Sequence, residues 1–403
     1  MLRESRVIEF AELSGLFFLT AMAMGAWFVP LGPVLEAHGL GALRPFAFAT
    51  SGTAALVSPL LFGALADRHL GPARVLRWLA LATAGAITLA ATAMRLRAGP
   101  IVVLALIQLH ALCSAPTWSL ASSIVLGRLR DAPREFGPIR ALATVGWMAG
   151  CWAVSALQAD SSTVACYTAA GVWLVVAGYT RRLPNPPALE SVGGRTLKQR
   201  LGLDALALLR QRDHRVVFVT AALFYVPLAG FYPFTPTHLR QLGMEHTAAW
   251  MTLGQISEII AMLGLAHVLG RVRLKWTLAT GLGFGLLRYG LCALDGKGWV
   301  LLGLSLHGFA FTLFFITTQI YLDQRVPPEW RTRAQALFSL FTSGMGNLVG
   351  YLGTGWWFSQ CQRAGAVNWA LFWGGLALVV VVVLVIFLVA YRGRGHGDRS
   401  VRD

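Results

Sequence analysis

Long apolar runs, separated by short clusters of charged residues, make up most of the chain. A helix needs about 20 mostly apolar residues to cross the hydrocarbon core of a bilayer, and twelve runs of about that length follow one another along the sequence. They lie at residues 8–31, 42–66, 73–94, 100–127, 139–158, 163–181, 214–237, 248–269, 275–294, 298–322, 333–355 and 367–391. This pattern predicts an all-α membrane protein with twelve transmembrane helices.

One segment between the runs is much longer than the others. It covers residues 182–213, which are rich in proline and then basic, and its stretch Leu201–Leu209 has the pattern of an amphipathic helix lying on the membrane surface. The segment divides the predicted helices into six plus six, an arrangement found in the major facilitator superfamily (MFS). The predicted parts are an N-terminal six-helix bundle (1–181), a cytoplasmic linker (182–213), a C-terminal six-helix bundle (214–391) and a basic cytoplasmic tail (392–403).

The charged residues give this arrangement an orientation. Only 13% of the 403 residues are charged, yet the net charge is +16, whereas soluble domains contain about 25% charged residues. Of the 34 lysines and arginines, 26 fall on the side that the termini share with alternate loops, six fall on the opposite side, and Arg140 and Arg288 lie within spans. The positive-inside rule therefore places both termini in the cytoplasm. Anionic lipid, rather than nucleic acid, is the expected partner of the basic surplus.

A single acidic residue stands in the middle of an apolar run. Glu258 lies halfway along Met251–Gly270, and Gln255 precedes it by three residues on the same helical face. A carboxylate at the bilayer centre costs about 2.5 kcal/mol or more, so it needs a partner, a proton or water. Glu258 is either a neutral packing residue or a group that handles protons or substrate in a cavity. We favour the second interpretation.

The fifth predicted span carries three different polar or aromatic groups on one face. Arg140, Thr144 and Trp147 are spaced at i, i+4 and i+7, so they lie along one stripe of a helix. A guanidinium, a hydroxyl and a large aromatic ring together suit a polar ligand that contains a ring. The alternative is an arginine whose charged end reaches the cytoplasmic headgroups, with a tryptophan packed beyond it.

Two further spans contain candidate ligand-binding residues. Pro227 and Gly230 predict that the seventh span is broken or bent, and Tyr232 lies just beyond the interruption. His307 and Phe311 are one turn apart in the tenth span. A histidine at such a place either titrates or is a core residue with satisfied hydrogen bonds.

Single polar or aromatic residues in other spans are more ambiguous. Trp27 faces a cavity or anchors its helix at the membrane interface. His110 is a second candidate cavity group, although its span also contains Pro116 and is expected to bend there. Arg288 needs an anion, a carbonyl or headgroups as its partner, and its spacing along the chain does not identify one.

Two short patterns indicate helix packing and gating. Gly146/Gly150 and Gly346/Gly350 each form a GxxxG pair, which allows close approach of helices. The loop after the second span resembles the MFS loop signature, since Gly63, Asp67 and Arg68 match it. We predict that the Asp67–Arg68 pair is a gating latch between conformational states. The alternative is a solvated pair that contributes less than about 1 kcal/mol.

Taken together, these segments resemble the bacterial nucleoside:proton symporter family of the MFS over nearly the whole chain. The resemblance is clearest in FGPIRALATVGW, LGLDALALL, GQISEII, GFGLLRYGL and VPPEWRTRAQALFSLFTSGMGNLVG. It implies that substrate binds between the two bundles, with aromatic rings stacked on the nucleoside base. The residues that it assigns to substrate binding, with Trp27 added from the pattern, are Arg140, Thr144, Trp147, Gln255, Glu258, His307, Phe311, Tyr232 and Trp27.

The chain departs from the family pattern at three places. His307 stands where the family has a tyrosine, and Thr312 stands where an acid follows the aromatic residue of the tenth span. Polar groups of the seventh span are replaced by Ala229 and Tyr232. Loss of hydrogen-bonding groups changes selectivity, and the loss of one acid leaves Glu258 as the main proton-coupling residue.

The predicted function is secondary active transport, with proton-coupled uptake of nucleosides or of a related polar, ring-containing metabolite by alternating access. We expect the proton as the coupling ion, no other cofactor, no metal, no catalytic residues, and a monomer in a bacterial inner membrane. An exporter of amphipathic or aromatic compounds is one alternative. An intramembrane enzyme is another, but HExxH and Gly-x-Ser-x-Gly motifs are missing from the sequence. The five cysteines lack metal-ligand spacing and are expected to be core residues.

Overall fold

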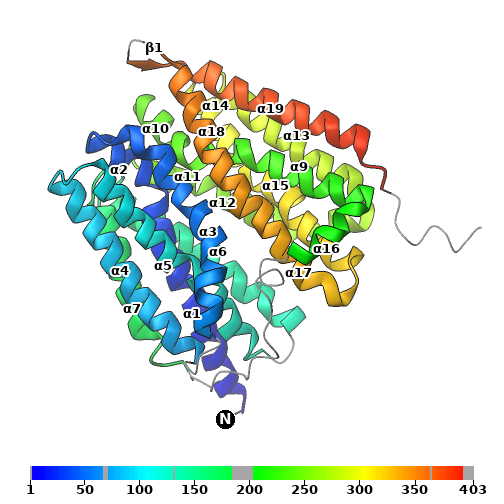
Figure 1. The fold of residues 1–403 in the computed structure, drawn as a ribbon, viewed down its shortest axis with the longest axis horizontal. Helices are drawn as coiled ribbons and strands as arrows, with labels where there is room; N and C mark the ends of the chain where they lie inside the picture. The colour runs from blue at the N-terminus through cyan, green and yellow to red at the C-terminus, as the bar shows by residue number, and fades with distance from the viewer. Residues whose placement is uncertain (1, 67–70, 130–131, 184–202, 364, 394–403) are drawn as a thin grey trace, which may run out of the picture. The chain divides into compact units, whose positions relative to one another are not determined.

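The computed structural model describes residues 2–66, 71–129, 132–183, 203–363 and 365–393, and most of them are helical (Figure 1). The chain forms two compact units. The first contains Met1–Gly194 together with Tyr232–Thr252, and the second contains Arg195–Phe231 together with Leu253–Asp403. The predicted gating residues Asp67 and Arg68 lie outside the described part of the chain.

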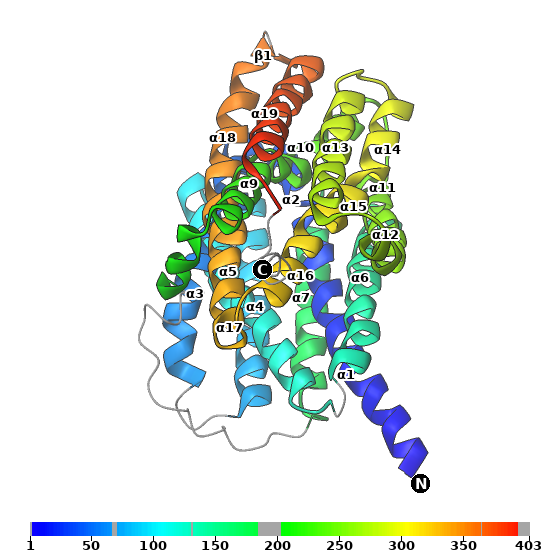
Figure 2. The same ribbon diagram turned by 90° about the vertical axis from the view of Figure 1, so that its right-hand side faces the viewer.

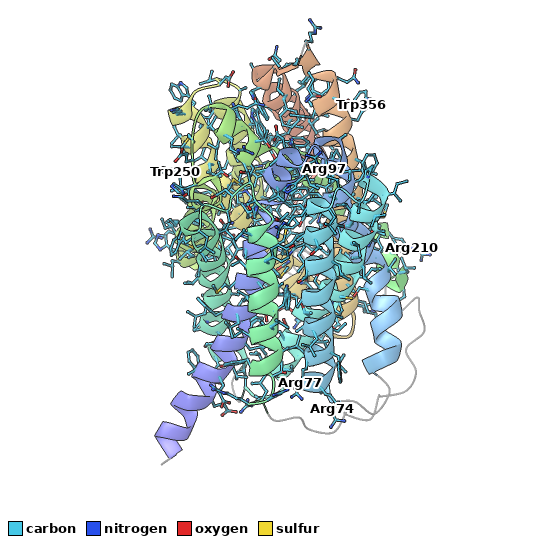
Figure 3. All side chains as sticks on the ribbon, turned by 90° about the vertical axis from the view of Figure 1, so that its left-hand side faces the viewer. Arg74, Arg77, Arg97, Arg210, Trp250 and Trp356 are labelled. Atoms are coloured by element: carbon cyan, nitrogen blue, oxygen red, sulfur yellow. The ribbon has the colours of Figure 1, made fainter. Side chains whose placement is uncertain are left out.

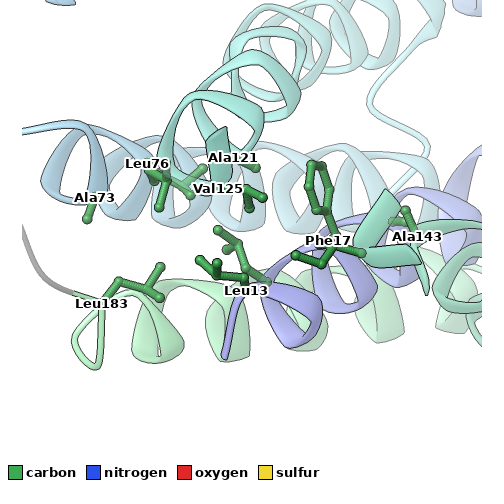
Figure 4. Packing of buried hydrophobic residues seen from close by; sticks show 12 residues of the cluster. Leu13, Phe17, Ala73, Leu76, Ala121, Val125, Ala143 and Leu183 are labelled. Atoms are coloured by element: carbon green, nitrogen blue, oxygen red, sulfur yellow. The ribbon is translucent and has the colours of Figure 1, made fainter. Parts of the chain in front are cut away.

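The first unit is built from long apolar helices. They are α1 (Leu2–Phe28), α2 (Leu31–Ala37), the short 3-10 helix η1 (Gly41–Leu43), α3 (Arg44–Ala66), α4 (Pro72–Arg95), α5 (Pro100–Leu126), α6 (Ala132–Ala156) and α7 (Val164–Tyr179), joined by α10 (Phe231–Gln241, from Tyr232 onward) and α11 (Thr247–Met251). Helix α1 packs on α6 and α7, and α4 packs on α5 and α7. Figure 4 shows the core near one end, where Leu13 and Phe17 of α1 lie beside Leu76, Val125 and Ala143.

Glycines bring α1 and α6 into close contact. A side chain at Gly146 would overlap the backbone at Phe18, and one at Gly150 would overlap the backbone at Met22. Gly25 in turn lies against the backbone of Trp147. The first predicted GxxxG pair is therefore confirmed as a packing device, and it fixes the height of the α6 residues relative to α1.

The second unit contains the remaining elements. They are the 3-10 helix η2 (Leu203–Arg210), α9 (Arg212–Ala229), α12 (Leu253–Arg271), α13 (Leu274–Cys292), α14 (Lys297–Ser305), α15 (His307–Phe311), the π-helical turn η3 (Thr312–Ile316), α16 (Thr317–Arg325), α17 (Pro328–Ser339), the π-helical turn η4 (Leu340–Gly346), α18 (Asn347–Gln360) and α19 (Trp369–Ala390). Strands β1 (Gln362–Arg363) and β2 (Ala366–Val367) pair antiparallel between α18 and α19, at the tip seen in Figure 2.

Glycine pairing and a helix break are confirmed in this unit as well. Gly350 lies against Val226 and Ala229 of α9, and Gly346 lies against Tyr225. The predicted interruption of the seventh span is present, because α9 ends at Ala229 and α10 begins at Phe231. The break is also where the chain passes from one compact unit to the other.

The amphipathic segment predicted at Leu201–Leu209 differs in helix type from the expectation. From Leu203 it is a 3-10 helix rather than an α-helix, and residues 201–202 lie outside the described part. Asp204 at its start forms an ion pair of 2.9 Å with Arg333 of α17, and Ala205 is buried. Side-chain contacts with α17, which the sequence pattern does not reveal, accompany the tighter winding.

Seven helical stretches in the described part are long and apolar enough to cross a bilayer. They are Glu9–Ala37, Pro72–Arg95, Pro100–Leu126, Arg212–Gln241, Thr247–Arg271, Lys297–Arg325 and Trp369–Ala390, with Val164–Tyr179 as a shorter apolar helix. In the first unit, Arg74 and Arg77 lie near one end of α4 and Arg97 follows its other end (Figure 3). Four of the five cysteines are buried, as predicted, and Cys113 is partly buried.

Candidate functional site

Helix α6 holds three of the predicted residues in the first unit. The guanidinium carbon of Arg140 lies 4.5 Å from the centre of the Trp118 ring on α5, which is a cation–π distance. Thr144 is buried one turn further on. Arg140 itself is exposed, so the ring of Trp118 supports one face of a guanidinium that solvent still reaches.

Three aromatic rings meet around Trp147, three residues after Thr144. Trp147, Phe28 and Tyr232 contact one another edge to face, with ring centroids 5.9 Å (Phe28–Trp147), 5.4 Å (Phe28–Tyr232) and 5.9 Å (Trp147–Tyr232) apart. The indole N–H of Trp147 is buried and donates no hydrogen bond to any described residue. A buried N–H without an acceptor destabilises the folded protein, so this N–H is a candidate donor to a ligand.

The other two aromatic candidates of this unit are packed more deeply. Trp27 is 5% exposed, and its ring contacts Phe28 and, at 4.3 Å, His110. His110 is fully buried, and its Nδ1 lies 3.2 Å from the carbonyl of Thr83. A carbonyl only accepts, so Nδ1 carries a proton. In this structure Trp27 joins the ring cluster through Phe28 rather than by touching Trp147.

In the second unit, a backbone contact sets the position of Glu258. The Gly308 N–H of α15 donates to the hydroxyl of Ser257 over 3.0 Å, and Gly308 packs directly on the backbone of Glu258. Glu258 is partly buried, whereas Gln255 on the same helix is buried. The glutamate is therefore held at a fixed height beside α15, the helix that carries His307.

His307 and Phe311 form part of a second aromatic group. The His307 ring stacks on Phe231 with centroids 4.2 Å apart and planes within 5°, and on Phe311 at 6.2 Å and 22°. Arg288 of α13 donates to Nδ1 of His307 and to the hydroxyl of Tyr289. The sequence left the partner of Arg288 open, and the structure gives it two partners, both of them neutral acceptors.

The tenth span changes its winding immediately after Phe311. Residues Thr312–Ile316 form a π-helical turn, and the hydroxyl of Thr317 donates to the carbonyl of Thr312 over 3.2 Å. The Thr312 hydroxyl is buried and has no hydrogen-bond partner in the described chain. Single π turns inside helices occur frequently at functional sites, and composition alone gave no signal of this one.

A polar network that the sequence did not reveal joins α11 to the end of α6. Asp160 accepts from the Ser155 hydroxyl (2.9 Å) and from the backbone N–H of Ala248 (2.7 Å), while Ser155 accepts from the N–H of Ala249 (3.0 Å). Nδ1 of His246 lies 3.0 Å from the carbonyl of Ser155. We call this set the Asp160 network. It borders a cleft of about 610 Å³ lined by Gln158, Asp160, Ser161, Arg240, Gly243, Met244, Glu245, His246 and Thr247.

We expect Asp160→Ala to destabilise the first unit. The substitution removes the acceptor of two hydrogen bonds from a side chain that is only 9% exposed, and bonds to a charged group contribute more than neutral ones. The expected loss is about 2 kcal/mol, measured by thermal unfolding in detergent. Ser161→Ala, one residue away in the same cleft, is the control and leaves the unfolding temperature unchanged. Equal effects of the two changes would contradict the network's role.

The structure thus groups the predicted residues within each unit. Arg140, Thr144, Trp147, Trp27 and Tyr232 belong to the first unit, and Gln255, Glu258, His307 and Phe311 belong to the second. Among the described residues, no cluster of three histidine, cysteine, aspartate or glutamate side chains is arranged to hold a metal ion.

Apolar helices long enough to cross a bilayer, with ionisable side chains in the middle of them, are typical of helical membrane transporters. Within that class, a family model described as "Nucleoside H+ symporter" matches residues 9–396. The chain therefore belongs to the nucleoside:proton symporter family.

Individual relatives agree with the family. YegT of Escherichia coli (strain K12), a candidate nucleoside transporter, is 32% identical over 95% of this chain and 93% of its own length. The xanthosine permease of the same organism is 26% identical over 94% of this chain and 95% of its own length. A crystal structure of a mutant of the nucleoside transporter NupG superposes with a TM-score of 0.87 at 25% identity, covering 95% of this chain and 100% of that chain.

These findings confirm the predicted family and the uptake-transporter class. The multi-pass membrane character predicted from the apolar runs is also confirmed. Because the family and its relatives are transporters, the non-enzyme interpretation is supported, and the exporter alternative gains no support from them.

Proposed function

We propose that this protein carries nucleosides together with protons into the cell across the bacterial inner membrane. The xanthosine and nucleoside relatives support the substrate class. The proposal includes twelve spans with both termini in the cytoplasm, supported by the excess of lysine and arginine on one side of the predicted topology. It also includes a monomer in contact with anionic lipid at its cytoplasmic face, and a gating role for Asp67 and Arg68.

Substrate recognition is assigned to two groups of residues. In the first unit, the Arg140 guanidinium and Thr144 hydroxyl bind polar groups of the nucleoside, while the Trp147–Tyr232–Phe28 rings offer apolar faces. In the second unit, Gln255 and His307 bind polar groups and Phe311 packs on a flat part of the ligand. Ribose and base together present this mixture of hydroxyls and a flat ring, which supports a nucleoside over a purely apolar compound.

Glu258 is assigned to proton coupling. The single observation that carries this assignment is the fastening of α12 to α15 by Ser257 and Gly308. Through this contact, a change at the carboxyl of Glu258 is transmitted to the helix bearing His307 and Phe311. A protonated Glu258 is neutral, so the site can close around it without the cost of a buried charge. Binding of a proton and binding of substrate are thereby linked.

The test is transport by purified protein in proteoliposomes. With an acidic exterior, labelled uridine or inosine is expected to accumulate inside, by about tenfold for each unit of pH difference if one proton accompanies each nucleoside, since tenfold corresponds to about 1.4 kcal/mol. A protonophore abolishes the accumulation. Equal nucleoside concentrations on both sides under a maintained gradient would reject the proposal.

A further inference from the structure

Arg288 is a buried cation whose partners are all neutral. It is 1% exposed, and its guanidinium carbon lies 4.9 Å from the ring centre of Phe231 and 4.2 Å from that of Tyr289. Its hydrogen bonds go to Nδ1 of His307 and to the Tyr289 hydroxyl. Within the described chain it forms no ion pair with a carboxylate. Such a buried charge depends on every acceptor around it.

The contact with Arg288 determines which ring nitrogen of His307 carries the proton. A guanidinium has donors and no acceptor, so Nδ1 of His307 must offer a lone pair to Arg288. The ring is then neutral and carries its one proton on Nε2. A second proton on Nδ1 would point at a cation, so His307 does not act as a proton carrier while this pairing persists.

The direction of the Nε2–H group is fixed as well. Phe231 and Phe311 stack on the ring and set its plane. A methyl group on Gly254 would lie 3.1 Å from Cδ2 and 3.4 Å from Cγ of His307, so the Cγ–Cδ2 side of the ring packs on α12, and the contact of Nδ1 with Arg288 then fixes where Nε2 points within the ring plane. Tyr289 completes the support, because its hydroxyl donates to the carbonyl of Pro227 over 2.6 Å.

We propose that Arg288 is a positioning residue that makes His307 a hydrogen-bond donor and thereby selects nucleosides whose base has an oxo group, in place of an amino group, at C4 of a pyrimidine or C6 of a purine. The inference rests on the proposed function. The O4 atom of uracil or the O6 atom of hypoxanthine or xanthine accepts the Nε2–H, whereas the amino group at the same position of cytosine or adenine would place donor against donor. A site built around one hydrogen-bonding pattern discriminates strongly against a ligand that lacks it.

Two pairs of nucleosides test the proposal, since the members of each pair differ mainly at one exocyclic group. Inosine is compared with adenosine, and uridine with cytidine, by the ratio of kcat/KM for uptake into proteoliposomes. The wild-type protein is expected to prefer the oxo member of both pairs by about tenfold or more. Ratios near one, or a preference for the amino member, would overturn the inference.

Substitutions of Arg288 separate positioning from a merely structural role. Arg288→Met removes the donor and frees His307 to present either nitrogen, so both ratios are expected to fall to about one. Arg288→Lys keeps a donor next to Nδ1 and is expected to keep the preference. Unchanged ratios in folded Arg288→Met protein would overturn the proposal, whatever happens to the overall rate.

A spectroscopic measurement on the wild-type protein keeps the test decisive if Arg288→Met does not fold. The chain has nine histidines, and ¹⁵N labelling of their rings reports which nitrogen bears the proton. The signal that disappears in His307→Asn is expected to be that of a neutral ring protonated on Nε2, and a proton on Nδ1 would overturn the inference. Transport of no nucleoside at all would reject the proposed function itself, which is distinguishable from transport with equal ratios.

Discussion

Glu258→Gln is expected to abolish concentrative uptake while leaving exchange of nucleoside across the membrane intact. The amide has nearly the shape of the protonated carboxyl, so the contact of Ser257 and Glu258 on α12 with Gly308 on α15 is retained. It cannot release or take up a proton, and the transport cycle then has no link to the pH gradient. Accumulation of about tenfold per pH unit is expected to fall to equal concentrations on both sides. Counterflow of labelled against unlabelled nucleoside measures the exchange that persists.

The control for this substitution is Glu245→Gln. Glu245 is an exposed acid beside the Asp160 network and lines the cleft there, so its change removes the same charge from a different place. Its uptake is expected to match that of the wild type. If Glu258→Gln protein still concentrates nucleoside under a pH gradient, another group carries the proton.

The positions of the helices were predictable because long helices of this kind require long runs of apolar residues, which are visible in the sequence. Apolar runs located the helices, and Pro227 with Gly230 located the break between α9 and α10. The pair Gly146/Gly150 predicted close helix contact because glycine is the residue that lets backbones touch. In each case the cause lies within a few neighbouring residues.

Features that depend on distant residues were not predictable in this way. Arg288 and His307 are 19 positions apart on different helices, and no spacing rule links them. Asp160 and Ala248 meet across 88 positions, so the Asp160 network has no local pattern. The π turn at Thr312 shifts hydrogen bonds by one residue, a change that leaves the apolar pattern of the span unaltered.

In the candidate site, too, local features were predictable from the sequence and contacts between distant residues were not. The stripe of Arg140, Thr144 and Trp147 follows from helix geometry, and the structure adds that Trp118 supports the guanidinium. His307 was chosen for its position one turn from Phe311, but its protonation follows only from Arg288. The chemistry of a histidine depends on what its second nitrogen contacts, which a single sequence does not contain.

Gly308→Ala is expected to reduce transport more severely than Glu258→Gln does, although it adds only one methyl group. The new Cβ would overlap the backbone of Glu258 and Ser257, and backbone atoms cannot rotate away as a flexible side chain does. Helices α12 and α15 must then separate, which breaks the hydrogen bond from Gly308 to Ser257. Overpacking of this kind costs about 1–3 kcal/mol, so a lower unfolding temperature is expected together with loss of both uptake and exchange.

A glycine on α12 itself provides the matched control. Gly264 has no atom within 4 Å of the position that a Cβ would occupy, so Gly264→Ala introduces the same methyl group without a clash. Alanine is also the better helix former, by about 1 kcal/mol in soluble helices, and the unfolding temperature is expected to stay the same or rise. Gly308→Ala disturbs the position of Glu258, whereas Glu258→Gln changes only the chemistry of that side chain. If exchange is lost in Gly308→Ala and survives in Glu258→Gln, the position of the carboxyl and its transfer of a proton have separate effects on transport.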